Sequence, residues 1–383
     1  MAAKKIFIVV ANLFIALVVF QSHTGFFKDM ILSGVEKKTE PRISSWKDLI
    51  DGTFQRDVET WLKQHIGFRG TFVKTDNQIT YSIFNEFSRT HPKQLILGDK
   101  KYLYEAFYVD VYNGLYRTQE HVLEQYAASI GRLQNLLAER GIAFILLISP
   151  SKATIYPEFI PKRFLRNIPR PVRDDYTVMI PLLKNHGVRC LDTRALFLEL
   201  KARGVPELFP TSGTHWSLYS ASLVAELLLK QVEDAMRRPI VRYRVTGAVP
   251  SREPIELDKD IARLANILFT RSLFTEYLYP ETEPIAPPGA YRPRMIIIGT
   301  SCSWNIIAHL DANRTFSDLD FYYYFNTRYH YPGVHPSPVD RTAVKWEDDI
   351  FSRDVIIMEI NEAIIGEDAF GFVEPAVKAL SQR

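Results

Sequence analysis

The chain has 383 residues, enough for one elaborated α/β domain or for two smaller domains. Hydrophobic residues make up 46% and charged residues 24%, which excludes a disordered chain, a collagen-like chain and a polytopic membrane protein. The 47 basic and 44 acidic residues give a dispersed formal charge of +3, so no nucleic-acid partner is expected. The two cysteines, Cys190 and Cys302, exclude a disulfide scaffold and a four-cysteine metal site, while a single bridge stays open. We expect neither a metal nor a cofactor.

The N-terminal segment has the pattern of a membrane-targeting sequence. Lys4 and Lys5 precede a stretch from Ile6 to Phe27 that carries no charge and is apolar up to Phe20 except at Asn12. No small-x-small cleavage site follows, which favours an uncleaved signal anchor over a cleaved signal peptide. A buried core helix is disfavoured because the run has no polar face. We therefore expect residues 1–28 to cross the inner membrane once and the main domain to lie in the periplasm.

The rest of the chain predicts a helical arm followed by an α/β domain. Residues 29–90 form the arm, with helical spacing of apolar residues from position 45, and a hairpin is expected over residues 95–104. From residue 91 to 383 helices alternate with buried strands, which is typical of a parallel sheet. Residues 238–294 are rich in proline and predict an irregular insertion. The expected helices are 119–140, 176–186 and 218–234, and the expected strands are 142–148, 188–191, 295–298 and 355–360.

Ser301 is the first candidate for chemistry. It follows the apolar strand that ends at Gly299, and such a strand-to-helix turn exposes a hydroxyl beside main-chain N–H groups that can hold an oxyanion. The alternative is that Ser301 only caps the helix that follows. Cys302 could instead act as a thiol nucleophile, although a buried cysteine is the commoner case.

Two further loops carry candidate groups. His215 precedes the helix that begins near Leu218, and it can act as a general base if the fold brings it to a serine. A hydrogen-bonded surface histidine is the alternative. Lys152 and neighbouring hydroxyls follow the first central strand, where they could bind an anionic substrate or shape the pocket wall. A solvated loop fits that segment equally well.

Together these segments resemble the SGNH-hydrolase-like alginate O-acetyltransferase family. The resemblance covers roughly residues 45–365 and implies a flavodoxin-like SGNH core in which the histidine segment precedes the serine segment. Triads tolerate such reordering because geometry defines them. The matching segments are, in order, Gly67-Phe68-Arg69, residues 97–104, Pro150 to Glu158, Thr214-His215-Trp216, Leu257 to Ala262 and Gly299-Thr300-Ser301.

The resemblance implies an exported or membrane-anchored enzyme that transfers acetyl groups to the hydroxyls of an exopolysaccharide. Ser301 would become acetylated and His215 would be its general base, with a membrane-bound acetyl-donor protein as an expected partner. Substrate contacts are expected from Lys152, Tyr156, Trp216 and Tyr323. Tyr323 belongs to an aromatic run over residues 321–325 that could stack on sugar rings, although aromatic alternation is also typical of a half-buried strand.

The sequence departs from the family at the orienting acid. The family pattern has an aspartate two residues before the histidine and another before the serine, where this chain has Gly213 and Thr300. Loss of such an acid can cost about 10⁴-fold in rate. Either a dyad works alone, a carboxylate arrives from elsewhere, or catalysis is lost. Glu359 and Glu362, after the last strand, are the first candidates for a replacement, and the alternative is that both are ordinary polar residues at a strand end. The leading hypothesis is therefore an O-acetyltransferase, followed by a catalytically impaired glycan- or partner-binding component of a polysaccharide assembly complex and by a carbohydrate esterase.

Overall fold

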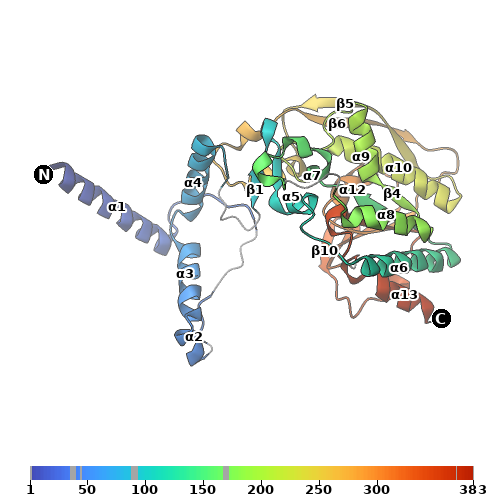
Figure 1. Cartoon of the computed structure of the whole chain (residues 1–383), viewed down its shortest axis with the longest axis horizontal. Helices are drawn as coiled ribbons and strands as arrows, with labels where there is room; N and C mark the ends of the chain where they lie inside the picture. Colours follow the sequence, from blue (N-terminus) through green and yellow to red (C-terminus); the bar gives the residue numbers. More distant parts are fainter. Residues whose placement is uncertain are drawn as a thin grey trace. The chain divides into compact units, whose positions relative to one another are not determined.

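The computed structural model describes residues 2–34, 40–43, 45–87, 94–166, 172–367 and 369–382. It divides into two compact units, which are described separately below (Figure 1). The first unit comprises Met1–His91 and Ala262–Ser272, and the second comprises Pro92–Ile261 and Leu273–Arg383. The predicted boundary between residues 90 and 91 lies outside the described residues.

The first unit contains the apolar N-terminal helix and the expected helical arm. The N-terminal helix α1 (Ala2–Thr24) has 23 residues, about 34 Å at 1.5 Å per residue, so its length and composition suffice to cross a membrane. The arm consists of α2 (Trp46–Ile50), α3 (Thr53–His65) and α4 (Arg69–Phe84). The carboxylate of Asp29 accepts hydrogen bonds from the main-chain N–H groups of Gly70 and Thr71 at the start of α4.

The second unit is built on a seven-stranded sheet, in agreement with the predicted α/β class. Its order is β10-β9-β8-β7-β11-β3-β4, in which β8, β7, β11, β3 and β4 are parallel and the last two strands at one edge are antiparallel. The strands are β3 (Ala143–Ser149), β4 (Cys190–Asp192), β7 (Arg294–Gly299), β8 (Asp318–Tyr323), β9 (Thr327–Tyr331), β10 (His335–Pro338) and β11 (Val355–Asn361).

Helices cover both faces of this sheet. In β11 the side chains of Val355 and Ile357 join one hydrophobic cluster, and those of Ile356, Met358 and Ile360 join the other. These apolar side chains alternate between the two faces with period 2, as a sheet buried on both faces requires, and only Glu359 and Asn361 near the end of the strand are polar. The first cluster packs with α9 (Thr193–Ala202), α10 (Leu218–Met236) and α12 (Ser303–Ala312), and the second with α6 (Glu120–Glu139), α8 (Asp175–Asn185) and α13 (Val373–Ser381).

The parallel strand that comes last in the sequence, β11, lies inside the sheet and not at its edge. β11 pairs with β3 on one side and with β7 on the other. The five parallel strands, counted along the chain, therefore stand in the order 2-1-5-3-4, whereas the flavodoxin order is 2-1-3-4-5. All five end at the same edge, so this arrangement brings the segments after β3, β7 and β11 together.

The insertion differs from the prediction, because it is regular over much of its length. β5 (Arg242–Ser251) and β6 (Tyr277–Ile285) form a long antiparallel ribbon, and a 3₁₀ turn (Glu256–Lys259) and the short helix α11 (Asp260–Leu264) lie between them. In a ribbon of two strands each strand has a free edge. Proline, which has no N–H, can therefore stand at positions whose N–H would point away from the partner strand. The proline content alone was therefore misleading.

Two smaller elements complete the second unit. The predicted hairpin is confirmed as the antiparallel pair β1 (Leu95–Leu97) and β2 (Leu103–Glu105), which runs into α5 (Ala106–Tyr112). The short helix α7 (Lys152–Ile155) follows β3.

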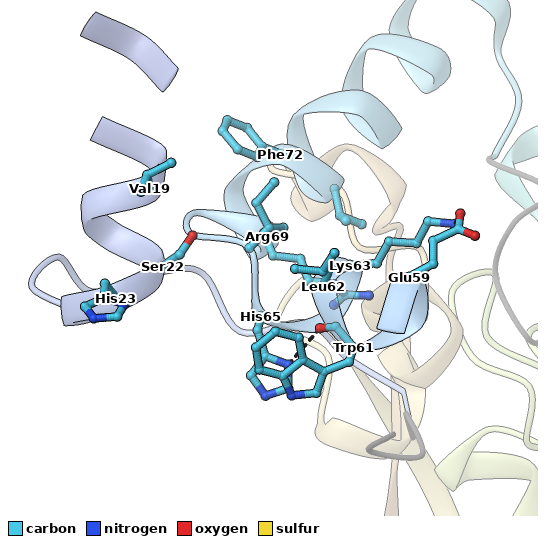
Figure 2. A pocket seen from close by; sticks show the side chains of 12 residues that line it. Val19, Ser22, His23, Glu59, Trp61, Leu62, Lys63, His65, Arg69 and Phe72 are labelled. Atoms are coloured by element: carbon cyan, nitrogen blue, oxygen red, sulfur yellow. Dashed lines mark hydrogen bonds and ion pairs between the residues drawn. The ribbon is translucent and has the colours of Figure 1, made fainter. Parts of the chain in front are cut away.

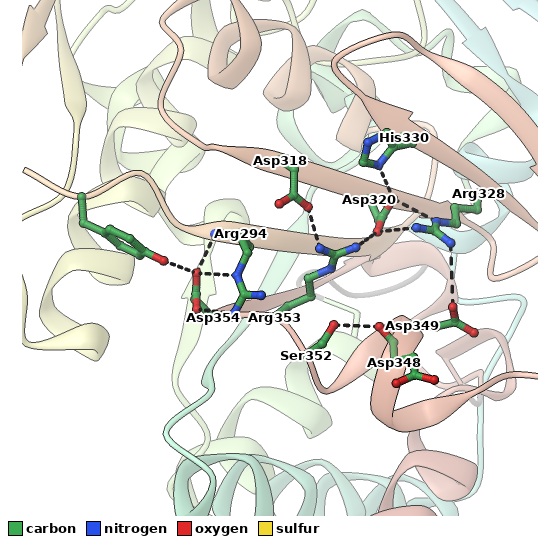
Figure 3. A network of polar contacts seen from close by, with 11 residues as sticks. Arg294, Asp318, Asp320, Arg328, His330, Asp348, Asp349, Ser352, Arg353 and Asp354 are labelled. Atoms are coloured by element: carbon green, nitrogen blue, oxygen red, sulfur yellow. Dashed lines mark hydrogen bonds and ion pairs between the residues drawn. The ribbon is translucent and has the colours of Figure 1, made fainter.

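An ion-pair network lies towards the amino ends of the strands (Figure 3). The fully buried carboxylate of Asp320 in β8 accepts two hydrogen bonds of 2.9 Å from Arg328 and one of 2.9 Å from Nδ1 of His330, both in β9. Arg353 also donates to Asp320 and, at 2.7 Å, to Asp318. Burial opposes the charge on Asp320, but these donors hold the pKa of its carboxyl below the usual value. The network fastens the antiparallel edge to the parallel sheet.

Candidate active site

Ser301 lies in the turn between β7 and α12, as predicted. It is half-buried, and its side chain interacts with the phenol of Tyr324. The first turn of the ten-residue helix α12 begins two residues later, at Ser303. N–H groups at a helix N-terminus favour negative charge, so an oxyanion that forms on a group attached to Ser301 can be stabilised there.

His215 lies in the loop between α9 and α10, and its imidazole is nearly buried, with 9% of the residue exposed. Its Nδ1 atom is 2.8 Å from Oδ2 of Asp260. Both ring nitrogens are buried and neither has a hydrogen bond of good geometry among the described residues, so Nδ1 is held by the ion-pair contact with Asp260 alone. A histidine held by a carboxylate at Nδ1 and free at Nε2 has the arrangement of a general base.

Two hydrogen bonds connect the histidine loop to the serine turn. The indole N–H of Trp216 donates to the carbonyl oxygen of Cys302 at 3.0 Å, and the side-chain amide of Asn305 donates to the carbonyl oxygen of Trp216 at 2.7 Å. Trp216 follows His215 and Cys302 follows Ser301, so these bonds bring the two candidate residues to one side of the sheet edge.

The carboxylate of Asp260 is fixed from two sides. Its Oδ1 accepts hydrogen bonds from the main-chain N–H groups of Thr214, at 2.8 Å, and Ile261, at 2.7 Å, while Oδ2 faces His215. Burial raises the pKa of the Asp260 carboxyl, but the nearby imidazole and these hydrogen bonds outweigh it and hold that pKa below its usual value. Asp260 therefore stays ionised and can stabilise an imidazolium at position 215.

The absence of a side chain at Gly213 makes room for the segment that carries Asp260. A Cβ atom at position 213 would lie 2.9 Å from the carbonyl oxygens of Leu257 and Asp258 and 2.9 Å from the ring of Pro210. The backbone of residues 257–258 thus fills the space beside the histidine loop. Gly213 itself offers no carboxylate, and that of Asp260 reaches His215 from the insertion.

The prediction of Glu359 as the orienting acid is wrong. The Glu359 carboxylate lies under the serine turn, where it accepts hydrogen bonds from Ser149 Oγ at 2.5 Å, from the N–H and the hydroxyl of Thr300 at 2.7 Å each, and from Ser303 Oγ at 3.1 Å. Burial raises the pKa of the Glu359 carboxyl, and these four bonds oppose that rise. Glu359 holds β3 and β7 across β11, and so shapes the turn that presents Ser301.

The prediction of Glu362 as that acid is wrong as well. One oxygen of its carboxylate accepts a hydrogen bond from the main-chain N–H of Ser151 at 2.7 Å. The other lies 3.1 Å from the guanidinium of Arg194, which also pairs with Asp174. Both oxygens are engaged at the end of β4 and β3, away from His215.

Lys152 is buried, which corrects its predicted contact with an anionic substrate. Its ammonium donates to the carbonyl oxygens of Leu103 at 3.0 Å and of Thr211 at 3.1 Å. Burial lowers its pKa to about 7, against the opposing charges of Asp260 and Glu105. Lys152 ties β2 to the start of the loop that carries His215.

The other predicted substrate contacts fall in two groups. Tyr156 and Trp216 lie in the hydrophobic core, where the hydroxyl of Tyr156 accepts a hydrogen bond from the N–H of Leu208 at 3.2 Å. Neither can stack on a sugar without leaving these contacts, so their predicted role is corrected. Tyr323 is half-buried at the end of β8, with its ring centroid 5.8 Å from that of Trp304, and sugar contact by Tyr323 remains a prediction.

The sequence did not assign three residues that the structure places at this site. Asp260 belongs to a segment that matched the family pattern but had received no role. Tyr324 reaches Ser301 from the turn after β8, and Tyr108 of α5 interacts electrostatically with Cys302, Tyr324 and Asp260. Burial is the main cause of the raised pKa values of both phenols, so both remain neutral. Tyr108 has no sequence signal, and the aromatic run over residues 321–325 predicts sugar contact for its members but no contact between Tyr324 and Ser301.

The remaining candidate groups are metal ligands and the two cysteines. No group of three or more His, Cys, Asp and Glu side chains lies close enough there to hold a metal ion. Cys190 and Cys302 are both free thiols. Burial raises the pKa of the Cys302 thiol to about 12, so it is a poor competitor of Ser301 as a nucleophile.

Comparison with known proteins identifies relatives of this domain. A family model described as "SGNH hydrolase-like domain, acetyltransferase AlgX" matches residues 96–283. A curated protein of Pseudomonas putida, "Probable alginate O-acetylase AlgJ", is 28% identical over 114 residues. That match covers 30% of this chain and 28% of the relative, so the chain spans little more than a quarter of the length of that protein.

Three solved structures illustrate what this chain is similar to among proteins of known structure. The O-acetyltransferase domain of P. putida AlgJ has a TM-score of 0.45 at 18% identity, over 75% of this chain and 98% of that one. P. aeruginosa AlgX has a TM-score of 0.45 at 14% identity, over 75% and 67% of the two chains. Bacillus cereus PatB1, solved with a sulfonyl adduct, has a TM-score of 0.45 at 11% identity, over 73% and 99%.

Proposed function

Because this chain is a divergent member of the SGNH hydrolase-like acetyltransferase family of the AlgX and AlgJ type, we propose that it is an O-acetyltransferase acting on an exopolysaccharide. The observation that carries the proposal is the pair of Asp260 and His215, tied through Trp216 to the turn that holds Ser301. The carboxylate of Asp260 lies beside His215, where it can take the role of the orienting acid that Gly213 cannot supply. This favours a working enzyme over a catalytically impaired relative.

The proposed reaction has two steps. In the first, Nε2 of His215 takes the proton of the Ser301 hydroxyl while Oγ attacks the carbonyl carbon of an acetyl donor. The tetrahedral oxyanion is stabilised near the start of α12, and the donor oxygen leaves with the proton from His215, which gives acetyl-Ser301. In the second step a sugar hydroxyl gives its proton to His215 and attacks the acetyl carbon, and Oγ of Ser301 leaves and regains the proton.

Labelling with an activated acetyl ester tests this assignment. We expect the peptide that contains Ser301 to gain the mass of one acetyl group, and Ser301→Ala to abolish the gain while thermal unfolding stays unchanged. Ser303→Ala is the matched control, because that neighbouring hydroxyl contacts Glu359 and should not carry the label. Labelling that survives Ser301→Ala, or that appears on Cys302, would contradict the proposal.

Transfer and hydrolysis differ only in the acceptor of the second step. If water replaces the sugar hydroxyl, the same residues form a carbohydrate esterase. Mixing the acetylated protein with acetyl-free exopolysaccharide separates the two activities. An O-acetylated polysaccharide is the expected product, and release of acetate alone would favour the esterase.

We also propose that α1 anchors the chain in the inner membrane with the main domain in the periplasm, where a membrane-bound acetyl-donor protein would be its partner. Support comes from the length and apolar composition of α1 and from Lys4 and Lys5 at its start. Protease added to intact spheroplasts should digest the second unit. Its full protection, with digestion only after lysis, would contradict this topology.

A further inference from the structure

The first unit exposes apolar side chains that no core of its own covers. α3 has no buried residue, and Trp61, Leu62 and the following Ile66 are 36%, 55% and 45% exposed. In α2, Trp46 and Ile50 are more than 80% exposed. Trp61, Leu62 and Ile66 line one pocket together, and exposed apolar surface of this kind marks a site of contact with a protein or a membrane.

The exposed side chains of α3 form one wall of an apolar pocket of about 1010 Å³ (Figure 2). Figure 2 shows α1 on one side of this pocket and the start of α4 above it. Val19 and Ser22 line it from α1, and Phe72 and Val73 line it from α4. A pocket of this volume suits a flexible chain of methylene groups.

Close packing fixes the pocket beside the last turns of α1. The main-chain N–H of Gly67, in the turn between α3 and α4, donates to Ser22 Oγ at 2.6 Å. A Cβ at position 67 would lie 2.6 Å from the carbonyl oxygen of Val18, so only glycine allows this approach. The ring of Phe72 lies 5.9 Å from that of Phe14, further towards the middle of α1. If α1 crosses the membrane, the pocket lies where the hydrocarbon meets the headgroups.

The polar rim of the pocket carries more positive than negative charge. Lys63 and Arg69 are its basic members, and Glu59, which pairs with Lys63 at 2.6 Å, is its acidic member. His23 and His65 also line the pocket. The indole of Trp61 stacks on His65 at 4.6 Å. Tryptophan and long basic side chains are typical of the membrane interface, where an apolar body faces the hydrocarbon and a polar end faces the headgroups.

We propose that this pocket binds an acyl chain of an anionic phospholipid in the membrane that α1 spans, with the lipid phosphate near Lys63 and Arg69. The inference rests on the anchoring proposed above, but not on acetyl transfer. It commits to lipid because the pocket adjoins the apolar surface of α1 and because its rim has the charge that complements a phosphate. Bound lipid would hold α3 at the membrane surface.

Photo-crosslinking of the full chain in nanodiscs of phosphatidylcholine and phosphatidylglycerol tests the proposal. A photoreactive phenylalanine analogue replaces Leu62, and mass spectrometry identifies the adducts. Thr60 is the matched control, because it is exposed on the same helix but two residues, or about 200°, away around its axis. Val10 in α1, which is 58% exposed, reports on the anchor itself.

We expect phospholipid adducts at positions 62 and 10 and at least tenfold fewer at position 60, with the adduct at 62 enriched in phosphatidylglycerol over its share of the nanodisc. Lipid adducts at 10 but not at 62 would overturn the lipid pocket and leave the anchor standing. Their absence at both positions would overturn anchor and pocket together. Adducts at 62 to a second copy or to another protein would also overturn the proposal, in favour of a protein interface.

Discussion

Replacing Asp260 by asparagine should remove most of the activity without unfolding the domain. The side-chain oxygen of the new amide can still accept the hydrogen bonds that Thr214 and Ile261 now donate to Oδ1. The amide NH₂ would then face Nδ1 of His215, where Oδ2 is now 2.8 Å away. This favours the tautomer with its proton on Nε2, which cannot take a proton from Ser301.

The size of the expected loss follows from this tautomer change. Asparagine in place of the triad aspartate lowers turnover by about 10⁴-fold in the serine protease case, or about 5 kcal/mol of barrier. We expect a loss of about 10³- to 10⁴-fold in the rate at which Asp260→Asn forms the acetyl-enzyme, measured by stopped-flow with an activated acetyl ester.

The neighbouring acid supplies the control for this experiment. Asp258 is also buried, but its carboxylate accepts a hydrogen bond from the hydroxyl of Tyr279 at 3.0 Å and not from His215. Asp258→Asn should keep the acetylation rate within about threefold. If Asp260→Asn stays within about tenfold of the wild type while both variants melt normally, the role of Asp260 as the orienting acid is refuted.

Three further variants probe the packing around the site. Gly213→Asp should lower activity and destabilise the fold by about 2–4 kcal/mol, because its Cβ would lie 2.9 Å from two carbonyl oxygens; a more active and equally stable variant in thermal unfolding would contradict this. Trp216→Phe should lower the free energy of unfolding by about 1–3 kcal/mol and slow acetylation, because the carbonyl of Cys302 loses its hydrogen-bond donor. An unchanged free energy of unfolding in urea titrations would argue against a role for that bond. Burial lowers the pKa of His309 from 6.5 to about 4, so between these pH values the unfolded chain binds a proton that the folded chain does not. The free energy of unfolding should therefore fall by up to about 3 kcal/mol from pH ~7 to pH ~4, and His309→Asn should flatten that dependence in urea titrations.

The strand ends could be predicted from the sequence, because local patterns determine them. Ser301 follows the short apolar run Met295 to Ile298. The sequence predicts such a run to be a buried strand, and the structure confirms this. His215 was found through its loop and its family motif. These two residues depend on neighbours within a few positions, which is the range over which sequence patterns carry information.

The orienting acid could not be predicted, because it depends on packing between distant segments. Asp260 reaches His215 across 45 positions, and only the steric fit of residues 257–258 against Gly213 reveals it. Glu359 was a reasonable candidate at a strand end, but the position of β11 inside the sheet turns its carboxylate towards Thr300. Likewise, no local pattern showed that Lys152 and Trp216 would be buried.

The central position of β11 has a consequence for the order in which the protein folds. β3 and β7 do not touch each other, and β11, which joins them, is synthesised some 200 residues after β3. A chain that emerges from its N-terminus therefore contains β3, the histidine segment and the serine segment before the strand that fills the middle of the sheet is made. Such high contact order slows folding and leaves two unpaired strand edges exposed. Cleavage of the chain between Ser301 and Val355 should thus yield an N-terminal fragment prone to aggregation, even though it contains Ser301, His215 and Asp260.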